Sequence, residues 1–362
     1  MKTYYNNSIE KLYTEYNMLL ELNDIYIGKD QLNIINNIKS EHLELYHDVL
    51  EIIKKFYKLL SSVKKNHEIT YQEFEQKLWI RLNEIHEVTK TLDKNLLKHL
   101  QLIFRGSLYH LLSESIILSR ALTKPFGYPG DFVMLQMLYE NKQVSQSNLG
   151  KYLDQFFLDD ILSRAVVDRV EVMGDRVIKF INESSKNEIN ILNIASGSGF
   201  ELRKIVQYNF NKKIIYHCFD QDLSSLLYIS KNFINKNINV EIRLYKEDIR
   251  NFFRKWNKNQ KFDLIYNIGL ADYLPEKILS SLIKESINHV ENNGVFVLAH
   301  KDYTSFPYHH PSWLYDWNFV HRNLKDYIDI IKRNTDKDFL IWFESSIKKV
   351  IYFSEFKISD DI

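Results

Sequence analysis

The chain has 362 residues, enough for two domains with a sizeable core. Its 48 Lys and Arg residues nearly balance its 47 Asp and Glu residues, so the net charge of +1 gives no general attraction to nucleic acid or to anionic membranes. Cys218 is the single cysteine, so an internal disulfide is excluded. No apolar run approaches the roughly 20 residues of a membrane span, and the N-terminus lacks the apolar core of a signal peptide. Together these features predict a soluble cytoplasmic protein.

The first part of the chain has the 3.6-residue apolar period of amphipathic helices. This period begins at Ile9, resumes after a cap at Ser40, and continues after a capping box that starts at Thr70. A fourth helical segment covers about 95–122 and is rich in Leu and Ile. These four segments predict a helical bundle or cap over 1–123. Their histidines are scattered, so no metal site is expected.

Proline and glycine concentrate in the stretch 124-KPFGYPGDF-132, although the whole chain has only 5 prolines and 10 glycines. Proline disfavours helix in the residue before it, whereas glycine permits tight turns. The stretch therefore predicts a domain boundary, with a connecting loop and lid segment over 124–150. We expect Tyr128 and Asp131 to fold over a ligand of the next domain, with a plain linker as the alternative.

After a further amphipathic helix near 161–181, short β-type runs alternate with helical segments. This alternation is typical of an α/β domain with a doubly wound, mainly parallel sheet, here expected over 151–362. The last two runs are separated by a short polar stretch and predict an antiparallel hairpin at the sheet edge. The seven runs are 189–195, 214–220, 239–245, 262–268, 294–300, 339–345 and 349–356.

The first β-type run leads into the glycine-containing loop 193-NIASGSGFE-201. Gly197 and Gly199 allow a sharp turn and a close approach of the backbone to a ligand, at the start of the next helix. Asp220 ends the second run at about the spacing of an acidic residue that binds ribose hydroxyls. Leu202 occupies the third position of a full G-x-G-x-x-G pattern, which argues against a dinucleotide site.

This constellation resembles the class I S-adenosylmethionine-dependent methyltransferases, whose first motif is acid-x-Gly-x-Gly-x-Gly. The chain departs from that motif at Asn193 and Ala195 but keeps the two closing glycines. The resemblance implies S-adenosylmethionine as cofactor and a Rossmann-like seven-stranded domain after the helical one. By position, it implies that the loop after the first β-type run lines the methionine part of the cofactor and that the loop after the second run holds the ribose. The loop after the third run would contact the adenine, and the loop after the fourth run would close the pocket. The implied residues are Ala195, Ser196, Gly197, Ser198, Gly199, Asp220, Gln221, Asp248, Ile249, Asn267 and Gly269.

Three segments resemble a narrower group of proteins. The stretch 124–132 is similar to a K-P-x-G-Y-x-G-D-Y/F motif, 269-GLADYLP-275 to a G-L-F-D-Y-L motif, and 313-WLYDWNFVHR-322 to a D-W-x-L-x-Y-R segment. The combination resembles methyltransferases of extracellular-factor (3-hydroxypalmitic acid methyl ester) biosynthesis. Azetidine-2-carboxylate synthases, which cyclise S-adenosylmethionine itself, share this architecture, and the sequence does not separate the two groups.

The two groups need different chemistry from the site. A carboxylate acceptor for the methyl group is already a nucleophile, whereas a hydroxyl acceptor needs a base. The segment after the fifth run offers His300, His309 and His310 at the expected carboxyl edge of the sheet. A cyclase needs the cofactor bent back on itself, with aromatic faces beside the sulfonium. The predicted catalytic set is Tyr128, Asp131, Tyr273 and His300.

Three functions remain open on the sequence alone. The leading hypothesis is a methyltransferase of secondary metabolism that acts on a small or fatty-acid-like substrate through its carboxyl or hydroxyl group. The second is a cyclase that forms azetidine-2-carboxylate and methylthioadenosine. The third is a cofactor-binding module without catalysis, to which Asn193 and Ala195 lend weight. No nucleic-acid partner is expected, and the helical domain has two open roles, homodimer formation and capping of the active site.

Overall fold

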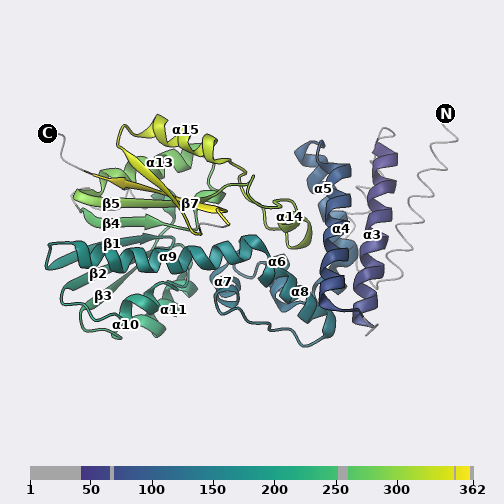
Figure 1. Cartoon of the computed structure of the whole chain (residues 1–362), viewed down its shortest axis with the longest axis horizontal. Helices are drawn as coiled ribbons and strands as arrows, with labels where there is room; N and C mark the ends of the chain where they lie inside the picture. The colour runs from purple at the N-terminus through teal and green to yellow at the C-terminus, as the bar shows by residue number, and fades with distance from the viewer. Residues whose placement is uncertain (1–41, 66–68, 252–259, 346–347, 359–362) are drawn as a thin grey trace. The chain divides into compact units, whose positions relative to one another are not determined.

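The computed structural model describes residues 42–65, 69–251, 260–345 and 348–358. The helix predicted from Ile9 and the cap at Ser40 lie outside these residues. The chain divides into two compact units, each made of several separate stretches (Figure 1). The helical unit takes the residues up to Pro125, Gln143–Leu158 and Tyr308–Trp317, and the sheet unit takes Phe126–Lys142, Asp159–Pro307 and the residues from Asn318.

The helical unit has its own apolar core. Buried residues recur at helical spacing, for example Val49, Ile53, Phe56 and Leu60, which explains why these segments fold as amphipathic helices. The helices are α3 (Leu43–Lys64), α4 (Tyr71–Thr89), α5 (Lys94–Leu112), α6 (Ile116–Thr123), α8 (Asn148–Asp159) and α14 (His310–Leu314).

The helix predicted over 95–122 is two helices, α5 and α6. The hydroxyl of Ser115 accepts a hydrogen bond from the backbone N–H of Leu118 at 3.0 Å and so begins the second helix. The capping box predicted at Thr70 is present at the start of α4. The hydrophobic period therefore predicted the extent of the apolar segment, but it did not reveal that the cap at Ser115 divides this segment into two helices.

The stretch Tyr308–Trp317 belongs to the helical unit. Within it, Trp313 is only 1 % exposed, and His309 stacks on His86 with ring centroids 4.2 Å apart. Burial lowers the pKa of His309 to about 3. The sequence offers His309 and His310 as candidate bases after the fifth β-type run, whereas the structure assigns both to the helical unit, where they are buried.

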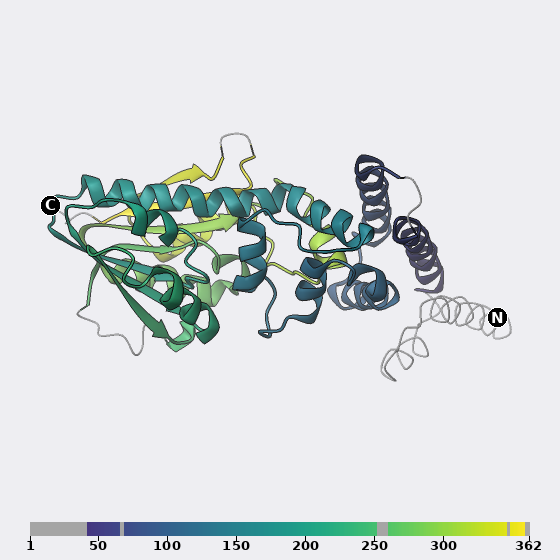
Figure 2. The same cartoon turned by 90° about the horizontal axis from the view of Figure 1, so that it is seen from below.

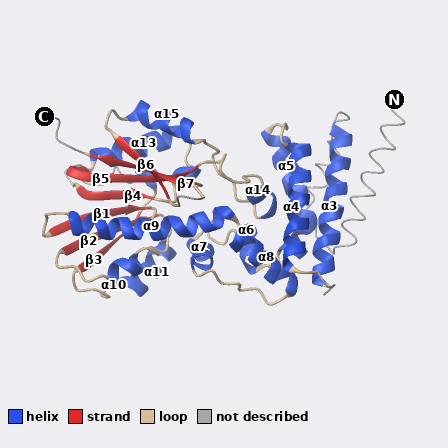
Figure 3. Ribbon diagram, viewed as in Figure 1, coloured by secondary structure: helices blue, strands red, loops and turns tan. Residues whose placement is uncertain are grey.

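The sheet unit contains one seven-stranded sheet with the order β3-β2-β1-β4-β5-β7-β6, drawn red in Figure 3. The first five strands in sequence are parallel, and β7 pairs antiparallel with both β5 and β6. This is the Rossmann-like fold of class I methyltransferases, with the terminal hairpin that the sequence predicts. The strands are β1 (Glu188–Ile194), β2 (Lys213–Asp220), β3 (Val240–Lys246), β4 (Phe262–Asn267), β5 (Val290–Lys301), β6 (Phe339–Phe343) and β7 (Ile351–Lys357).

Helices cover both faces of this sheet. On one face α13 and α15 share an apolar cluster with strand residues such as Phe296 and Phe356. Neighbours along a strand point to opposite faces, so Glu355 lies on the other face. There it pairs with Arg176 of the long helix α9, which lies along the sheet in Figure 2. The helices of this unit are α7 (Phe132–Tyr139), α9 (Ile161–Glu183), α10 (Leu202–Gln207), α11 (Leu223–Phe233), α13 (Glu276–Asn288), α15 (Leu324–Asn334) and the 3₁₀ turn η2 (Ala271–Tyr273).

Candidate active site

A pocket of about 340 Å³ lies at the carboxyl ends of the parallel strands of the sheet unit. Ligands bind at this edge in open α/β sheets. The wall combines the loops after β1, β2, β3 and β4 with the stretch that leads into α7. The lining residues are Tyr128, Pro129, Gly130, Phe132, Leu135, Ala195, Gly197, Phe219, Asp220, Gln221, Glu247, Ile249, Gly269, Leu270 and Tyr273.

The loop after β1 is built on three residues with left-handed backbone. Ala195, Gly197 and Gly199 have φ values of 56°, 52° and 58°. A Cβ at Gly197 would meet no atom within 4 Å, so this glycine leaves the pocket wall open to a ligand. A Cβ at Gly199 would come within 2.8 Å of Leu202, so this glycine is needed for packing of α10. The predicted Ser196 and Ser198 are buried and do not belong to the lining residues.

Asp220 joins the loops after β1 and β2. Its Oδ2 accepts the backbone N–H of Gly197 and its Oδ1 accepts that of Asp222, both at 2.8 Å. Burial raises the pKa of Asp220, although the two backbone hydrogen bonds oppose this increase. The Ser225 hydroxyl also donates to this carboxylate, which can accept about four hydrogen bonds in all, so Asp220 can still accept one from a ligand hydroxyl. Gln221 follows it in the pocket wall.

The stretch around Tyr128 forms one side of the pocket. The Tyr128 hydroxyl donates to Asp222 Oδ2 at 3.0 Å, and the rings of Phe126 and Phe132 stack with centroids 5.6 Å apart. Burial, followed by the charge of Asp222, raises the pKa of Tyr128, so its phenol stays neutral. Tyr128 lines the same pocket as Ala195, which supports the lid interpretation over a plain linker.

Asp131 caps α7. Its Oδ1 accepts the backbone N–H groups of Val133 and Met134, each at 3.0 Å, and the side chain is buried. The sequence predicts Asp131 over a ligand of this domain, whereas its carboxylate accepts hydrogen bonds from the backbone at the start of α7.

The predicted adenine contact after β3 falls on the neighbours of Asp248. Glu247 and Ile249 line the pocket, whereas Asp248 Oδ2 pairs with Arg250 at 2.5 Å. The hydrogen bond from Arg250 lowers the pKa of Asp248 to about 2 despite partial burial. The Asp248 side chain therefore pairs within its own loop, and Glu247 lines the pocket in its place.

Asn267 links the ends of two strands. Its Nδ2 donates to the carbonyl of Ile194 at 2.6 Å, and its Oδ1 accepts the N–H of Leu270 at 3.3 Å. The side chain is fully buried and is not among the lining residues. Asn267 therefore holds the loop that brings Gly269 to the pocket.

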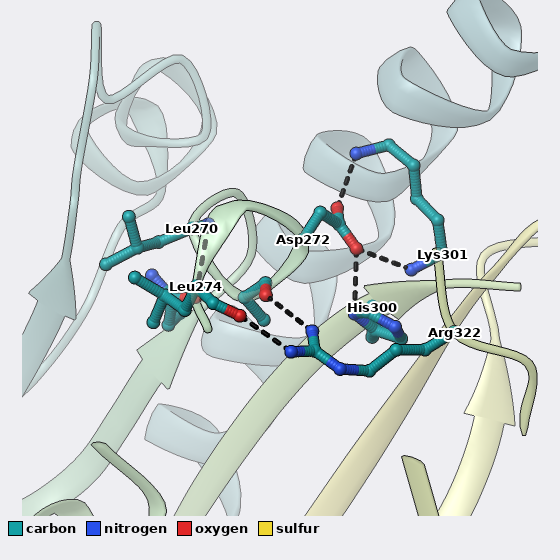
Figure 4. Close-up of polar contacts among 8 residues, drawn as sticks. Leu270, Asp272, Leu274, His300, Lys301 and Arg322 are labelled. Atoms are coloured by element: carbon teal, nitrogen blue, oxygen red, sulfur yellow. Dashed lines mark hydrogen bonds and ion pairs between the residues drawn. The ribbon is translucent and has the colours of Figure 1, made fainter. Parts of the chain in front are cut away.

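A buried ionic network supports the turn that carries Tyr273 (Figure 4). Asp272 forms an ion pair with Lys301 Nζ and accepts the Lys301 backbone N–H at 2.9 Å. His300 Nδ1 lies 2.8 Å from the same carboxylate. Burial opposes ionisation, but the charges of Lys301 and His300 outweigh it and hold the pKa of Asp272 well below its usual range.

The structure does not support contact of His300 with a ligand. Its side chain is 1 % exposed, stacks on Tyr327 with centroids 4.5 Å apart, and is not among the lining residues. Arg322 contributes to the same support, because it donates to the carbonyl of Leu274 at 2.7 Å. His300 thus positions the turn, whereas the predicted Tyr273 does reach the pocket.

Sequence reasoning missed Glu201. Its Oε1 accepts from Asn193 Nδ2 at 2.5 Å and from the hydroxyl of Tyr266 at 2.6 Å. Burial raises the pKa of Glu201, and the hydrogen bond from Tyr266 opposes the increase. The carboxylate that the motif lacks at position 193 is therefore present behind the loop, eight positions further along. The available signal was an acidic residue directly before the helix that follows the glycine-containing loop.

Over the described part of the chain, no three or more His, Cys, Asp or Glu side chains gather in a way that would hold a metal ion. None of the described helices combines the length and apolar character that crossing a membrane requires.

Comparison with models of protein families and with curated proteins gives no match for this sequence. Solved structures do give matches. An S-adenosylmethionine-dependent methyltransferase from Clostridium acetobutylicum is 16% identical over 53% of this chain and 91% of its own, with a TM-score of 0.39. Magnesium protoporphyrin IX methyltransferase from Synechocystis, with bound S-adenosylhomocysteine, is 11% identical over 68% of this chain and 99% of its own, with a TM-score of 0.46.

A possible exported protein from Bordetella parapertussis is 12% identical over 89% of this chain and 99% of its own, with a TM-score of 0.49. These three TM-scores are below 0.5. The assignment of the fold therefore rests on the strand order and the terminal hairpin described above, and the assignment of function rests on the pocket.

Proposed function

We propose that this chain is an S-adenosylmethionine-dependent methyltransferase that methylates the carboxyl group of a small or lipid-like acceptor. The observation that carries the proposal is the position of Asp220. Its carboxylate lies in the pocket wall, at the end of β2, and is fixed by the N–H of Gly197 in the adjoining loop. This is the arrangement needed to hold ribose hydroxyls at the edge of a Rossmann-like sheet.

The rest of the pocket suits the other parts of the cofactor. Phe219 and Ile249 offer apolar surface beside Asp220 for the adenine, and Tyr128 and Tyr273 offer aromatic faces for the sulfonium cation. Because the phenol of Tyr128 stays neutral, it can attract the cation without acting as a base. Positioning of the acceptor in line with the methyl group supplies much of the rate in such a reaction.

The lining residues favour a carboxylate acceptor over a hydroxyl. They include no histidine, since His300 is turned to Asp272. A hydroxyl would have to lose a proton during transfer, whereas an ionised carboxylate already carries the attacking lone pair. The attack forms an ester O–CH₃ bond, breaks the S–CH₃ bond and leaves S-adenosylhomocysteine, with no proton to remove.

The test is product analysis with purified protein, S-adenosylmethionine and a panel of short and long-chain carboxylic acids and 3-hydroxy acids. We expect S-adenosylhomocysteine and a methyl ester in equal amounts with at least one acid. Binding of the cofactor without turnover across the panel would favour a non-catalytic module. Methyl ethers in place of esters would overturn the choice of acceptor group.

A second candidate is cyclisation of the cofactor itself. The pocket volume of about 340 Å³ is near the low end of the roughly 300–1,000 Å³ typical of ligand pockets, and a cyclase needs no second substrate site. In this reaction the amino nitrogen attacks the γ-carbon, the sulfur leaves as methylthioadenosine, and the nitrogen loses a proton. Incubation with S-adenosylmethionine alone distinguishes cyclisation from methyl transfer. Formation of methylthioadenosine and azetidine-2-carboxylate would overturn the methyltransferase proposal.

A further inference from the structure

One buried cation stands beside the pocket without a role in the scheme above. Arg169 lies on α9 and is only 4 % exposed. Its Nη2 is 3.8 Å from the point where a Cβ at Gly269 would stand, and Gly269 is part of the pocket wall. The missing side chain at this glycine therefore leaves the guanidinium next to the pocket.

Arg169 forms no ion pair among the described residues, although the buried carboxylate of Glu201 lies within range of its charge. Its Nε has no hydrogen-bond partner there, and its side-chain hydrogen bond goes to the neutral hydroxyl of Tyr139. By contrast, the buried Lys301 of this unit pairs directly with Asp272. A buried cation without a directly paired anion is costly, and a ligand carboxylate paired with the guanidinium would reduce that cost.

The order of the loops places Arg169 at one particular end of the ligand. Along the strand order, Ile249 follows β3, Asp220 ends β2, Gly197 follows β1 and Gly269 follows β4. A cofactor whose ribose meets Asp220 would thus extend its methionine part past Gly197 toward Gly269. The methionine part ends in a carboxylate, which would arrive beside Arg169.

We propose that Arg169 binds the α-carboxylate of S-adenosylmethionine across Gly269. The planar guanidinium matches a carboxylate with two parallel hydrogen bonds, which an ammonium group cannot reproduce. The inference rests on the proposed cofactor but not on the choice between methyl transfer and cyclisation. Arg169 is a binding residue in this scheme, and the nucleoside end of the cofactor does not depend on it.

Calorimetric binding of two probes tests the inference. S-adenosylhomocysteine carries the carboxylate, and methylthioadenosine has the same nucleoside and sulfur without it. In Arg169→Met we expect the affinity for S-adenosylhomocysteine to fall about 10- to 100-fold, as for loss of hydrogen bonds to a charged group, and that for methylthioadenosine to change less than about twofold. Arg164→Met, on an exposed part of the same helix, is the control and should leave both affinities unchanged.

The outcomes separate cleanly. An unchanged affinity of Arg169→Met for S-adenosylhomocysteine, or an equal loss for both probes, overturns the inference, the latter because it shows a structural role. If Arg169→Met does not fold, Arg169→Lys keeps the charge but lacks the planar guanidinium. This variant should bind S-adenosylhomocysteine more weakly than the wild type does and bind methylthioadenosine equally well. An equal change in the affinities for both probes also overturns the inference. Failure of the wild-type protein to bind either probe overturns the proposed function itself.

Discussion

Ala195 has a backbone conformation that L-amino acids rarely adopt, with φ of 56°. A Cβ in this region costs roughly 1–2 kcal/mol, which explains why the resembling motif has glycine at the equivalent position. We expect Ala195→Gly to raise the free energy of unfolding by about 0.5–1 kcal/mol, after the entropy that glycine adds to the unfolded chain. Denaturant unfolding measures this, and a less stable variant would show that the methyl group of Ala195 contributes packing.

Asp220 is expected to strengthen cofactor binding while lowering the stability of the unliganded protein. Asp220→Asn keeps the shape but removes the charge, so the affinity for S-adenosylhomocysteine should fall about 10- to 100-fold. The pKa of Asp220 is raised by burial, so at neutral pH the ionised carboxylate costs stability to the unliganded protein. In Asp220→Asn this cost is removed, but the new amide NH2 faces one of the two backbone N–H donors and leaves it unpaired, so the two effects oppose each other at neutral pH.

The same variant has a predicted pH dependence. As the pH falls, wild-type Asp220 gains its proton in the folded state before the unfolded state does, and its cost disappears. The stability of Asp220→Asn relative to the wild type should therefore fall in acid. Thermal unfolding from neutral to mildly acidic pH checks this, and a relative stability that rises in acid would show that the ionised form is the favoured one.

At the scale of single residues, the sequence predicted the glycine-rich loop and Asp220 because their spacing is local. It could not separate Asp248 from Glu247, since which of two adjacent acids faces the pocket depends on the pairing of Asp248 with Arg250. It also could not find the contact of Asn193 with Glu201, because both residues point behind the loop and only the folded turn brings them together.

Helix α7 depends on its cap for its place in the pocket wall. Asp131→Ala should lower the free energy of unfolding by about 0.5–2 kcal/mol and weaken S-adenosylhomocysteine binding, because Gly130 and Phe132 beside it line the pocket. Asp131→Asn keeps a capping oxygen and should preserve both properties. A large loss of affinity in Asp131→Asn would mean that the carboxylate charge meets the ligand's amino group directly.

The turn η2 is expected to depend on the buried ion pair beneath it. Asp272→Asn leaves Lys301 without its anion and should cost about 3–5 kcal/mol, measured by denaturant unfolding. The double variant Asp272→Asn with Lys301→Met should recover most of this loss, because apolar packing often replaces a buried pair at little cost. No recovery in the double variant would place the main interaction of Asp272 elsewhere, such as His300.

This ion pair also sets an acid limit. The lowered pKa of Asp272 means that its contribution is fully present above the ordinary pKa of about 3.9 and is lost as the pH falls toward the lowered value. The stability of the double variant should therefore fall less steeply in acid than that of the wild type.

Elements were predicted well where one periodicity dominated and poorly where tertiary packing decided. The strand runs and the terminal hairpin match β1 to β7, because buried β-branched and aromatic runs have few other solutions. The stretch 313–322 contributes only the end of a short helix, since α14 ends at Leu314. The sequence around His309 and His310 gives no sign of which unit buries it.

At the scale of the whole molecule, the pocket is lined only by residues of the sheet unit. A ligand at 100 times its Kd stabilises the state that binds it by about 2.7 kcal/mol. S-adenosylhomocysteine should therefore slow hydrogen exchange most in α7 and at the carboxyl ends of β1, β2 and β4. Equal slowing throughout α3, α4 and α5 would show that the helical unit takes part in binding.

The chain leaves and re-enters the helical unit several times, and the wall that contains Tyr128 is reached before any strand of the sheet. This order has a consequence for biosynthesis. Tyr273, on another side of the same pocket, follows about 145 residues later, which at 5–20 residues per second is roughly 7–30 s of translation. In the early part of that interval, before β1 to β4 have been synthesised, the aromatic stretch around Phe126 and Phe132 has no sheet to cover, so we expect it to be exposed in the nascent chain.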